Sequence, residues 1–326
     1  MKAVFIRRFG GPEVLEYGER PLPVPGSGEV RVKVHAAGVN PRDWLIREGR
    51  YVFQALLPRL PLILGSDVSG TVEACGSGVT RFQPGDSVFG MQPVRSRLGT
   101  YAEAVVMRAS VLAHKPGQVS HLEAAALPCA GLTALQALTR LGRVEPGSRV
   151  LVNGASGGVG SFAVQIARIL GAEVTGVTST TNLELVRSLG ASRVLDYTRE
   201  DFTQTLTDQD VIFDAVGRSS LHHCRGVLAP GGRYLTTVPA RGVLWSALQG
   251  ALHRWRPRQP PSAHLVLVRA DARDLERLAS WMVGGELRSL IEHTYPLADV
   301  RLAHERSRSW RTRGKLVLVP LVRSEL

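Results

Sequence analysis

Residues 153–160 read NGASGGVG, and this glycine-rich stretch restricts the fold more than any other part of the sequence. It follows the apolar run RVLV and precedes SFAVQIARIL, whose apolar residues recur at helical spacing. Gly154, Gly157 and Gly160 form the GxxGxxG variant of the dinucleotide-binding fingerprint. Glycines let the backbone approach a pyrophosphate, and a helix beginning near Gly158 adds a partial positive charge. Glycine-rich turns also serve as plain strand-to-helix connections, so the neighbouring elements have to decide between the two roles.

The neighbouring elements support dinucleotide binding. Apolar strands and amphipathic helices alternate from Ser120 onward, and a second strand follows the loop within about thirty residues. Such alternation indicates a parallel sheet covered on both faces. Six strands make a full doubly wound Rossmann sheet. The six predicted strands are RVLVNG, EVTGVT, RVLDY, DVIFDAVG, GRYLTTV and HLVLV.

The rest of the chain has a different character. Residues 1 to about 115 carry short alternating strands between Gly- and Pro-rich turns, a pattern typical of a small, irregular β-barrel. The C-terminal residues predict a helix, a strand region and the terminal strand GKLVLVP, which we expect to pack back onto the barrel. The α/β chain is therefore predicted to have a β-barrel domain at 1–121, completed by 270–326, and a cofactor-binding Rossmann domain at 122–269.

The end of the second Rossmann strand bears on the choice of cofactor. EVTGVTST closes with four hydroxyl side chains at residues 178–181, about where an NAD-binding protein carries Asp or Glu for the ribose 2′-hydroxyl. A carboxylate there would repel a 2′-phosphate, so hydroxyl groups in its place favour NADP(H). The same residues can cap the helix expected from Asn182, and the two roles are compatible.

Five segments of the chain carry a resemblance to a known family. They are AAGVNPRDWLIREG at 36–49, PLILGSDVSGTVEACGSGVTRFQPGDSVFG at 61–90, ALPCAGLTALQAL at 126–138, the NGASGGVG loop and the closing RGKLVLV. With them, the sequence resembles the medium-chain dehydrogenase/reductases, and among these the zinc-independent quinone oxidoreductases. The branch it looks most like is that of the mitochondrial reticulon-interacting oxidoreductases and their bacterial relatives. The resemblance implies a GroES-like fold for the catalytic β-barrel domain.

Zinc-dependent members of that family hold a catalytic metal with a Cys, a His and a later Cys. Here Asn40 stands at the first position and Ser66 at the second, and only Cys129 matches a ligand type. One thiolate does not hold catalytic zinc, which takes three protein ligands and a water. The four-Cys structural lobe is also missing between Gly90 and Tyr101. We therefore expect no metal. Without a metal to polarise the substrate, a conjugated acceptor is favoured, because its own oxygen accepts the electrons that arrive with the hydride.

The resemblance also assigns site residues. Asn40 is expected to bind the acceptor oxygen, Asp43 to order the loop, and Tyr51 to donate a proton or shape the pocket. The alternatives are a turn residue for Asp43 and plain packing for Tyr51. Many relatives have Lys at the position of Asn182, which weakens the NADP(H) preference without reversing it. The expected cofactor-binding residues are Thr133, Gly154, Ser156, Gly157, Gly158, Val159, Gly160, Thr178, Ser179, Asn182, Tyr197, Gly217 and Lys315.

Composition restricts the partners and the compartment. The formal charge is +12, and of the 40 basic residues four are lysine and 36 arginine. These arginines are spread along the chain rather than gathered in a tail or groove, so no nucleic-acid partner is expected. Three widely spaced cysteines indicate neither a disulfide framework nor a zinc motif. The sequence has no secretory signal and no membrane-spanning apolar stretch, so we expect a cytoplasmic protein without stable membrane insertion.

The segment at 241–261, RGVLWSALQGALHRWRPRQPP, has an apolar stripe at helical spacing. A substrate-pocket lid or a subunit contact is the favoured role, and a membrane-surface helix is the alternative. In relatives the strand that corresponds to HLVLV pairs across a dimer, so the resemblance implies a homodimer.

The sequence thus predicts an NADPH-dependent, zinc-independent reductase that transfers hydride to a quinone or an α,β-unsaturated carbonyl. Two alternatives stay open. One is an NADP(H)-linked dehydrogenase of another carbonyl or alcohol. The other is a non-catalytic NADPH-binding sensor or interaction protein, because a fold alone does not establish a function.

Overall fold

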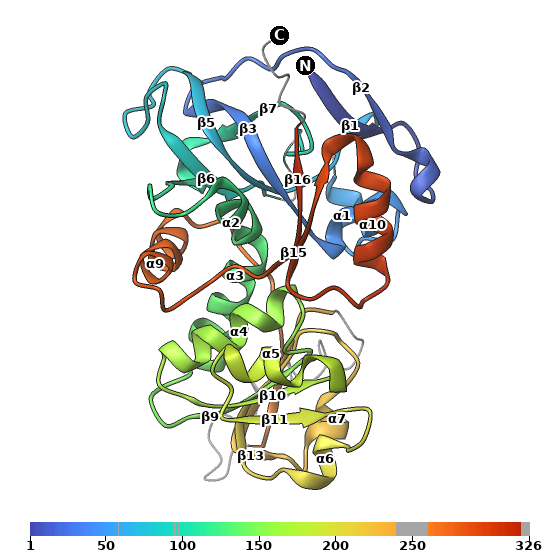
Figure 1. The fold of residues 1–326 in the computed structure, drawn as a ribbon, viewed down its shortest axis with the longest axis vertical. Coiled ribbons are helices and arrows are strands. Elements are labelled where there is room, and N and C mark those ends of the chain that lie inside the picture. Colours follow the sequence, from blue (N-terminus) through green and yellow to red (C-terminus); the bar gives the residue numbers. More distant parts are fainter. Residues whose placement is uncertain (58, 94–95, 97, 239–259, 321–326) are drawn as a thin grey trace. The chain divides into compact units, whose positions relative to one another are not determined.

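The computed structural model describes residues 1–57, 59–93, 96, 98–238 and 260–320 (Figure 1). The chain divides into two compact units. The first unit comprises Met1–Leu132 and Arg269–Leu326, and the second unit comprises Thr133–Val268. Residues 241–259 of the amphipathic segment considered above lie outside the described residues.

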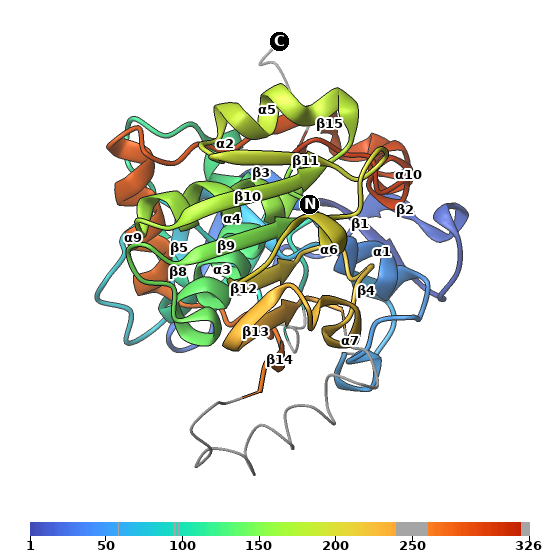
Figure 2. The ribbon, with the colours of Figure 1, turned by 90° about the horizontal axis from the view of Figure 1, so that it is seen from below.

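The second unit contains the predicted Rossmann sheet. Its six strands run in the order β11-β10-β9-β12-β13-β14, and all neighbouring strands are parallel (Figure 2). The order 3-2-1-4-5-6 is that of a doubly wound dinucleotide fold, so the fold prediction is confirmed. The strands are β9 (Arg149–Asn153), β10 (Glu173–Thr178), β11 (Arg193–Asp196), β12 (Gln209–Asp214), β13 (Leu228–Thr236) and β14 (Ser262–Leu265).

Helices bury the faces of this sheet, which explains why its central strands are apolar throughout. Val150, Leu151 and Val152 of β9 are all fully buried. Helices α4 and α5 pack against β9, β10 and β11, while α7 and the π-helical turn η4 pack against β12 and β13. The helices are α4 (Gly158–Ile169), α5 (Leu183–Ser188), α6 (Phe202–Thr205) and α7 (Leu221–Cys224), and η4 spans Ala137–Gly142.

The last Rossmann strand differs from its sequence prediction. The run HLVLV extends to Val268, whereas β14 ends at Leu265. Its partner β13 ends at Thr236, which is paired with Leu265. The Val266 N–H still donates to the Thr236 carbonyl at 2.8 Å, and Thr236 is the last residue of β13.

The first unit is built on two sheets. A three-stranded sheet has the order β2-β1-β4, and a seven-stranded sheet has the order β15-β16-β3-β5-β6-β8, with β7 also paired to β3. Strand β16 pairs antiparallel with β3 from Leu316 to Leu318, so C-terminal residues complete a sheet that starts near the N-terminus. The strands are β1 (Lys2–Ile6), β2 (Glu16–Glu19), β3 (Glu29–Val39), β4 (Leu62–Ile63), β5 (Asp67–Cys75), β6 (Ser87–Met91), β7 (Ala104–Arg108), β8 (Leu112–His114), β15 (Ile291–Pro296) and β16 (Lys315–Val319).

Strand β3 changes its environment along its length. Val30, Val32 and Val34 are buried, and the intervening Lys33 is exposed, as expected for a strand with one face toward a core. From Ala36 to Val39 every residue is buried, because α2 packs on β3 and β5. The buried end of β3 leads directly into Asn40 and α1.

The apolar segment after Ser120 forms two helices rather than one. Ser120 caps α2: its Oγ accepts from the Glu123 N–H at 3.2 Å, and the Glu123 carboxylate accepts from the Ser120 N–H at 3.0 Å. The run is interrupted after α2, and α3 begins at Pro128, which has no N–H to continue the helical ladder. The helices are α1 (Pro41–Arg47), α2 (His121–Ala126), α3 (Pro128–Gln136), α9 (Ala272–Val283) and α10 (Val300–Arg308).

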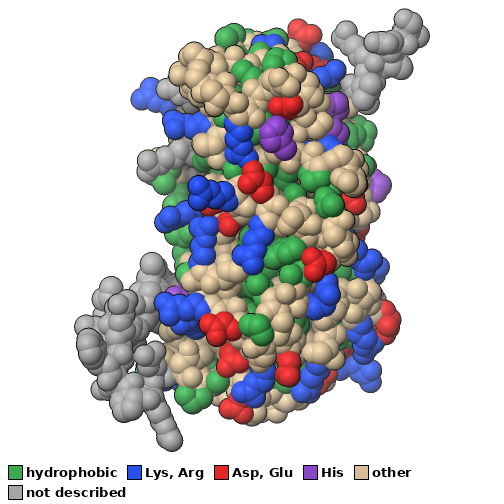
Figure 3. Space-filling model, turned by 90° about the vertical axis from the view of Figure 1, so that its left-hand side faces the viewer, with side chains coloured by type: hydrophobic (Ala, Val, Ile, Leu, Met, Phe, Trp, Pro, Cys, Tyr) green, Lys and Arg blue, Asp and Glu red, His purple; other side chains and the backbone are tan. Residues whose placement is uncertain are grey.

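Charged side chains are mixed over the visible face of the molecule in Figure 3. Lys and Arg side chains alternate there with Asp and Glu, and no continuous basic stripe crosses this face. In the described residues, no helix combines the length and the hydropathy that a membrane crossing requires.

Candidate active site

The glycine loop joins β9 to α4 as predicted, and two of its glycines are required by the fold. Gly154 has a φ of +81°, and a Cβ atom there would lie 2.1 Å from Cγ2 of Val216. A Cβ atom on Gly160 would lie 2.0 Å from the carbonyl oxygen of Gly154. Any larger residue at either position would collide with the chain itself.

Gly157 is different, because its described surroundings do not require a glycine. Its φ of −80° and ψ of 179° are extended values that any residue adopts, and an added Cβ would lie 3.4 Å from its nearest neighbour. Gly157 is the N-cap of the 12-residue helix α4, and it makes no side-chain cap bond. Because Gly157 has no side chain, it does not cover the backbone N–H groups at the start of α4. N–H groups left open in this way fit the binding of a dinucleotide's pyrophosphate.

Polar side chains gather beside this loop. Oγ1 of Thr178 donates to Oγ of Ser156 at 2.8 Å. Nδ2 of Asn182 donates to Oγ of Ser156 at 3.3 Å and to Oγ of Ser179 at 3.1 Å. Oδ1 of Asn182 is buried and has no hydrogen-bond partner among the described residues. A buried acceptor of this kind calls for a donor, and a ribose hydroxyl is one, so the site also fits the ribose of a dinucleotide.

Asp196, at the end of β11, was not among the predicted site residues. It is buried, and its carboxylate accepts hydrogen bonds from the hydroxyls of Thr180 and Thr198. Its neighbour Tyr197 is 63% exposed, and the Tyr197 N–H donates to the Thr178 carbonyl at 3.0 Å. In the sequence, only its place at the end of the apolar run VLD could have pointed to Asp196 as a site residue. In the structure, Asp196 holds the hydroxyl-rich turn after β10.

Apart from Lys315, which lies in the first unit, the remaining predicted cofactor residues lie at three other places in the chain. Gly217 follows β12, and its N–H donates to Oδ1 of Asp214 at 2.9 Å. Asp214 is fully buried and also accepts from the Tyr234 hydroxyl, so it shapes this turn. Thr133 is buried in α3. The third place is the first turn of α4, where Gly158 and Val159 are partly exposed.

Asn40 and Asp43 meet in the first unit, where they begin helix α1. Oδ2 of Asp43 accepts from the Asn40 N–H at 2.8 Å and from the hydroxyl of Tyr101 at 2.7 Å. Asp43 is 1% exposed, and this burial raises its pKa to about 6. Asp43 therefore holds the chain at the start of α1, and Tyr101 is a partner that the sequence did not point out.

Both the nitrogen and the oxygen of the Asn40 side-chain amide form hydrogen bonds within the protein. Its Nδ2 donates to Oδ2 of Asp67 at 2.9 Å and to Oγ of Ser66 at 3.3 Å. Its Oδ1 accepts from Nζ of Lys315. An acceptor oxygen would reach Nδ2 by displacing Ser66, whose bond is the longer of the two.

Lys315 and Asp67 form a buried ion pair beneath Asn40. Nζ of Lys315 lies 3.6 Å from Oδ2 of Asp67 and donates to the Val39 carbonyl at 3.0 Å. Oδ1 of Asp67 accepts from the Cys129 N–H at 3.0 Å. Burial raises the pKa of Asp67, and the positive charge of Lys315 opposes that effect. The sequence placed Lys315 among the cofactor-binding residues, and its ammonium group is engaged within the first unit.

The three positions at which the resemblance places zinc ligands do not fit a zinc ion. The Asn40 amide and the Ser66 hydroxyl are neutral and hydrogen-bonded to each other. Burial raises the pKa of the Cys129 thiol to about 12, so the thiolate that zinc requires is disfavoured. Across the described ranges, no three His, Cys, Asp or Glu side chains group as metal ligands.

Tyr51 and Arg42 border this cluster. Tyr51 is partly exposed and packs edge to face against Phe53, with ring centroids 5.8 Å apart. Burial raises its pKa above the usual value, so the phenol keeps its proton at neutral pH. Arg42 interacts electrostatically with Tyr51, Cys129 and Asp43. The sequence reasoning did not single out Arg42, because one arginine among 36 carries no pattern.

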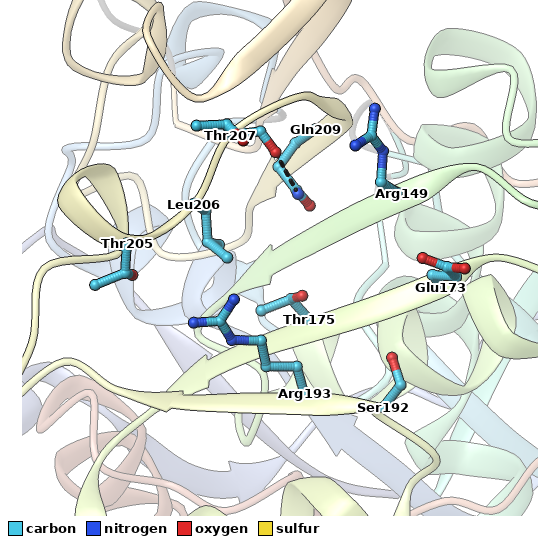
Figure 4. Close-up of a pocket in the computed structure, with 9 residues that line it drawn as sticks. All are labelled: Arg149, Glu173, Thr175, Ser192, Arg193, Thr205, Leu206, Thr207 and Gln209. Atoms are coloured by element: carbon cyan, nitrogen blue, oxygen red, sulfur yellow. Dashed lines mark hydrogen bonds between the residues drawn. The ribbon is translucent and has the colours of Figure 1, made fainter.

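A hollow of about 290 Å³ lies elsewhere in the second unit (Figure 4). It is lined by the first residues of three strands, Arg149, Glu173 and Arg193, and by Gln209. Parallel strands start at the edge of a sheet opposite to the one where they end. The hollow therefore lies on the other edge of the sheet from the glycine loop, and none of the predicted site residues lines it.

Comparison with known proteins places the chain in a family. Residues 26–117 match the model of the alcohol dehydrogenase GroES-like domain, and residues 189–318 match that of zinc-binding dehydrogenases. The chain belongs to the medium-chain dehydrogenase/reductase family of oxidoreductases. The resemblance stated from the sequence, the GroES-like domain and the Rossmann sheet are thereby confirmed.

Individual relatives narrow this class. The chain is 34% identical to the chloroplast envelope quinone oxidoreductase homolog of Arabidopsis thaliana, over 95% of each chain. It is also 34% identical to the mitochondrial NAD(P)H oxidoreductase RTN4IP1 of Mus musculus, over 98% of this chain and 89% of that protein. The crystal structure of the Escherichia coli quinone oxidoreductase complexed with NADPH matches with a TM-score of 0.84 and 28% identity, over 98% of this chain and 100% of that one.

Proposed function

We propose that this chain is an NADPH-dependent, zinc-independent reductase of quinones or α,β-unsaturated carbonyls. One observation carries the proposal: the open glycine at Gly157 coexists with a cluster in which Asn40 and Ser66 stand where zinc ligands would be. The names of the relatives support the same reading, since they include quinone oxidoreductases and an NADPH complex. The cytoplasmic location and the homodimer stay predictions.

The second unit is proposed to bind the cofactor. The N–H groups around Gly157 and the start of α4 would hold the pyrophosphate. The hydroxyls of Ser156 and Ser179 and the amide of Asn182 would contact the adenosine ribose and its 2′-phosphate. A reduced nicotinamide, when bound, supplies the hydride for the reaction.

The first unit is proposed to serve the acceptor. When an acceptor takes up a hydride, negative charge develops on its conjugated oxygen, and a proton must follow. Tyr51 is the proposed proton donor, because its phenol is protonated at neutral pH and partly exposed. Its phenolate would recover the proton from water. The buried network of Asn40, Asp67 and Lys315 would keep the lining rigid.

The test is turnover of NADPH with a panel of quinones and enones, before and after dialysis against a chelator. We expect NADPH oxidation with at least one acceptor, much slower oxidation of NADH, and no loss of activity after dialysis. If dialysis abolished the activity and added zinc restored it, the protein would be a zinc-dependent enzyme and the proposal would be wrong.

The same panel separates the alternatives. Oxidation of simple alcohols with NADP⁺, at rates above those for any quinone or enone, would favour the dehydrogenase. NADPH binding without turnover of any acceptor would favour the sensor.

A further inference from the structure

Arg42 carries a positive charge and forms no ion pair with any residue that the structure describes. It is the second residue of α1 and is partly exposed. Its Nε atom is buried and has no hydrogen-bond partner among the residues that the structure describes. A buried guanidinium nitrogen without a partner calls for an explanation.

The neighbouring carboxylates do not supply one. Oδ2 of Asp43 already accepts from the Asn40 N–H and the Tyr101 hydroxyl. Asp67 accepts from Asn40 and from the Cys129 N–H and is paired with Lys315. Both acids therefore accept hydrogen bonds from other donors, and Arg42 adds only a more distant positive charge.

The charge of Arg42 acts electrostatically on Tyr51, the proposed proton donor. Burial lowers the pKa of the guanidinium, but the opposing influence of Cys129, Asp43, Tyr51 and Asp67 leaves the pKa above its usual value. The guanidinium therefore stays charged at neutral pH. Arg42 as a whole residue is partly exposed although its Nε is buried, so part of the residue is open to a ligand.

We propose that Arg42 binds the acceptor oxygen and stabilises the negative charge that develops there during reduction. This inference rests on the proposed function and extends it by naming the group that replaces a metal's positive charge. The balance of the step is simple. The acceptor gains two electrons and one hydrogen as hydride, and its oxygen gains a proton from Tyr51, while no bond to Arg42 forms or breaks. Arginine suits this role because its guanidinium presents several N–H donors in a fixed plane and does not lose its proton.

The experiment replaces Arg42 with Met, which keeps the length and removes the charge. Arg108→Met is the matched control, because Arg108 is an exposed arginine at the end of β7 in the same unit. For Arg42→Met we expect kcat with the best acceptor to fall roughly 100-fold or more, the cost of losing one preorganised donor. The affinity for NADPH, followed by its fluorescence, should stay within about twofold of wild type, and Arg108→Met should match wild type in both measurements.

The outcomes separate this inference from the function on which it rests. If wild type reduces quinones or enones and Arg42→Met retains more than a third of kcat, Arg42 does not stabilise the acceptor oxygen, although the proposed function stands. If wild type reduces none of the acceptors, the proposed function itself has failed.

A second measurement needs no variant and therefore holds even if Arg42→Met does not fold. A nitrophenol whose own hydroxyl titrates near neutral pH is bound to wild-type protein with oxidised cofactor, at pH values on either side of that titration. We expect the phenolate to bind at least tenfold more tightly than the neutral phenol. Equal affinity for the two forms would overturn the inference.

Discussion

Removing the ammonium group of Lys315 is expected to destabilise the protein strongly. Lys315 is 3% exposed and Asp67 is fully buried, with 3.6 Å between Nζ and Oδ2. At that separation, an effective dielectric constant of about 20 gives an attraction of roughly 4 to 5 kcal/mol. Breaking a buried pair by removing one partner costs about 3 to 5 kcal/mol, because an uncompensated charge remains. We therefore expect Lys315→Met to lower the free energy of unfolding by about 3 to 5 kcal/mol at pH 7.

The assay is urea unfolding of the full chain, followed by tryptophan fluorescence and circular dichroism. Lys33→Met is the control, because Lys33 is exposed on β3, and its effect should stay within about 0.5 kcal/mol. The double variant Lys315→Met with Asp67→Asn removes both charges and should be more stable than Lys315→Met alone.

The pH dependence of the Lys315→Met variant has a definite sign. Without its cation, folded Asp67 takes up a proton at a pH where unfolded Asp67, with a pKa of about 3.9, does not. The destabilisation should therefore shrink as the pH falls from about 7 to 5. A loss below about 1 kcal/mol at pH 7, or a double variant no more stable than Lys315→Met, would show that the pair does not hold this cluster together.

Two further predictions concern His304 and the glycine loop. His304 is fully buried, Arg47 lies 3.2 Å from its Nδ1, and burial lowers its pKa to about 3. Unfolded histidine binds a proton below about pH 6.5, so stability should be lost as the pH falls from there toward 3; between pH 7 and 5 wild type should lose about 2 kcal/mol more than His304→Gln in urea unfolding. An equal loss in both proteins would exclude His304 as the cause. Gly157→Val should weaken NADPH binding at least tenfold with an unchanged melting temperature, whereas Gly154→Val should lower the melting temperature because its Cβ would meet Val216. Unchanged affinity in Gly157→Val, measured by NADPH fluorescence, would contradict the loop assignment.

Elements with a strong local pattern were predictable from the sequence. The six Rossmann strands and the helix after the glycine loop follow from apolar runs, helical periodicity and glycine spacing within short windows. Helix α10 was not predicted, because only Val300, Ala303 and His304 of its nine residues are buried and its apolar pattern is weak. The end of β14 was misplaced because it depends on where the partner strand stops.

The residues of the candidate site likewise fall into those that the sequence predicted and those that only the structure revealed. The three glycines and the hydroxyls after β10 stand close together in the sequence, so their spacing alone suggested a cofactor loop. The roles of Lys315, Asp67 and Tyr101 depend on contacts across long stretches of chain. Lys315 bonds to Asn40, 275 residues away, because β16 pairs with β3.

The sequence by itself determined the order of the six Rossmann strands along the chain, the dinucleotide loop and the absence of two zinc-ligand side chains, because each of these is a local property of residue type and spacing. Only the tertiary structure decided which glycine is open to a ligand and which buried acid meets which cation. It also singled out Arg42, which forms no ion pair with any of the described residues. Burial and charge pairing arise when distant segments pack together, and they in turn set the pKa of Asp43 at about 6 and that of Cys129 at about 12.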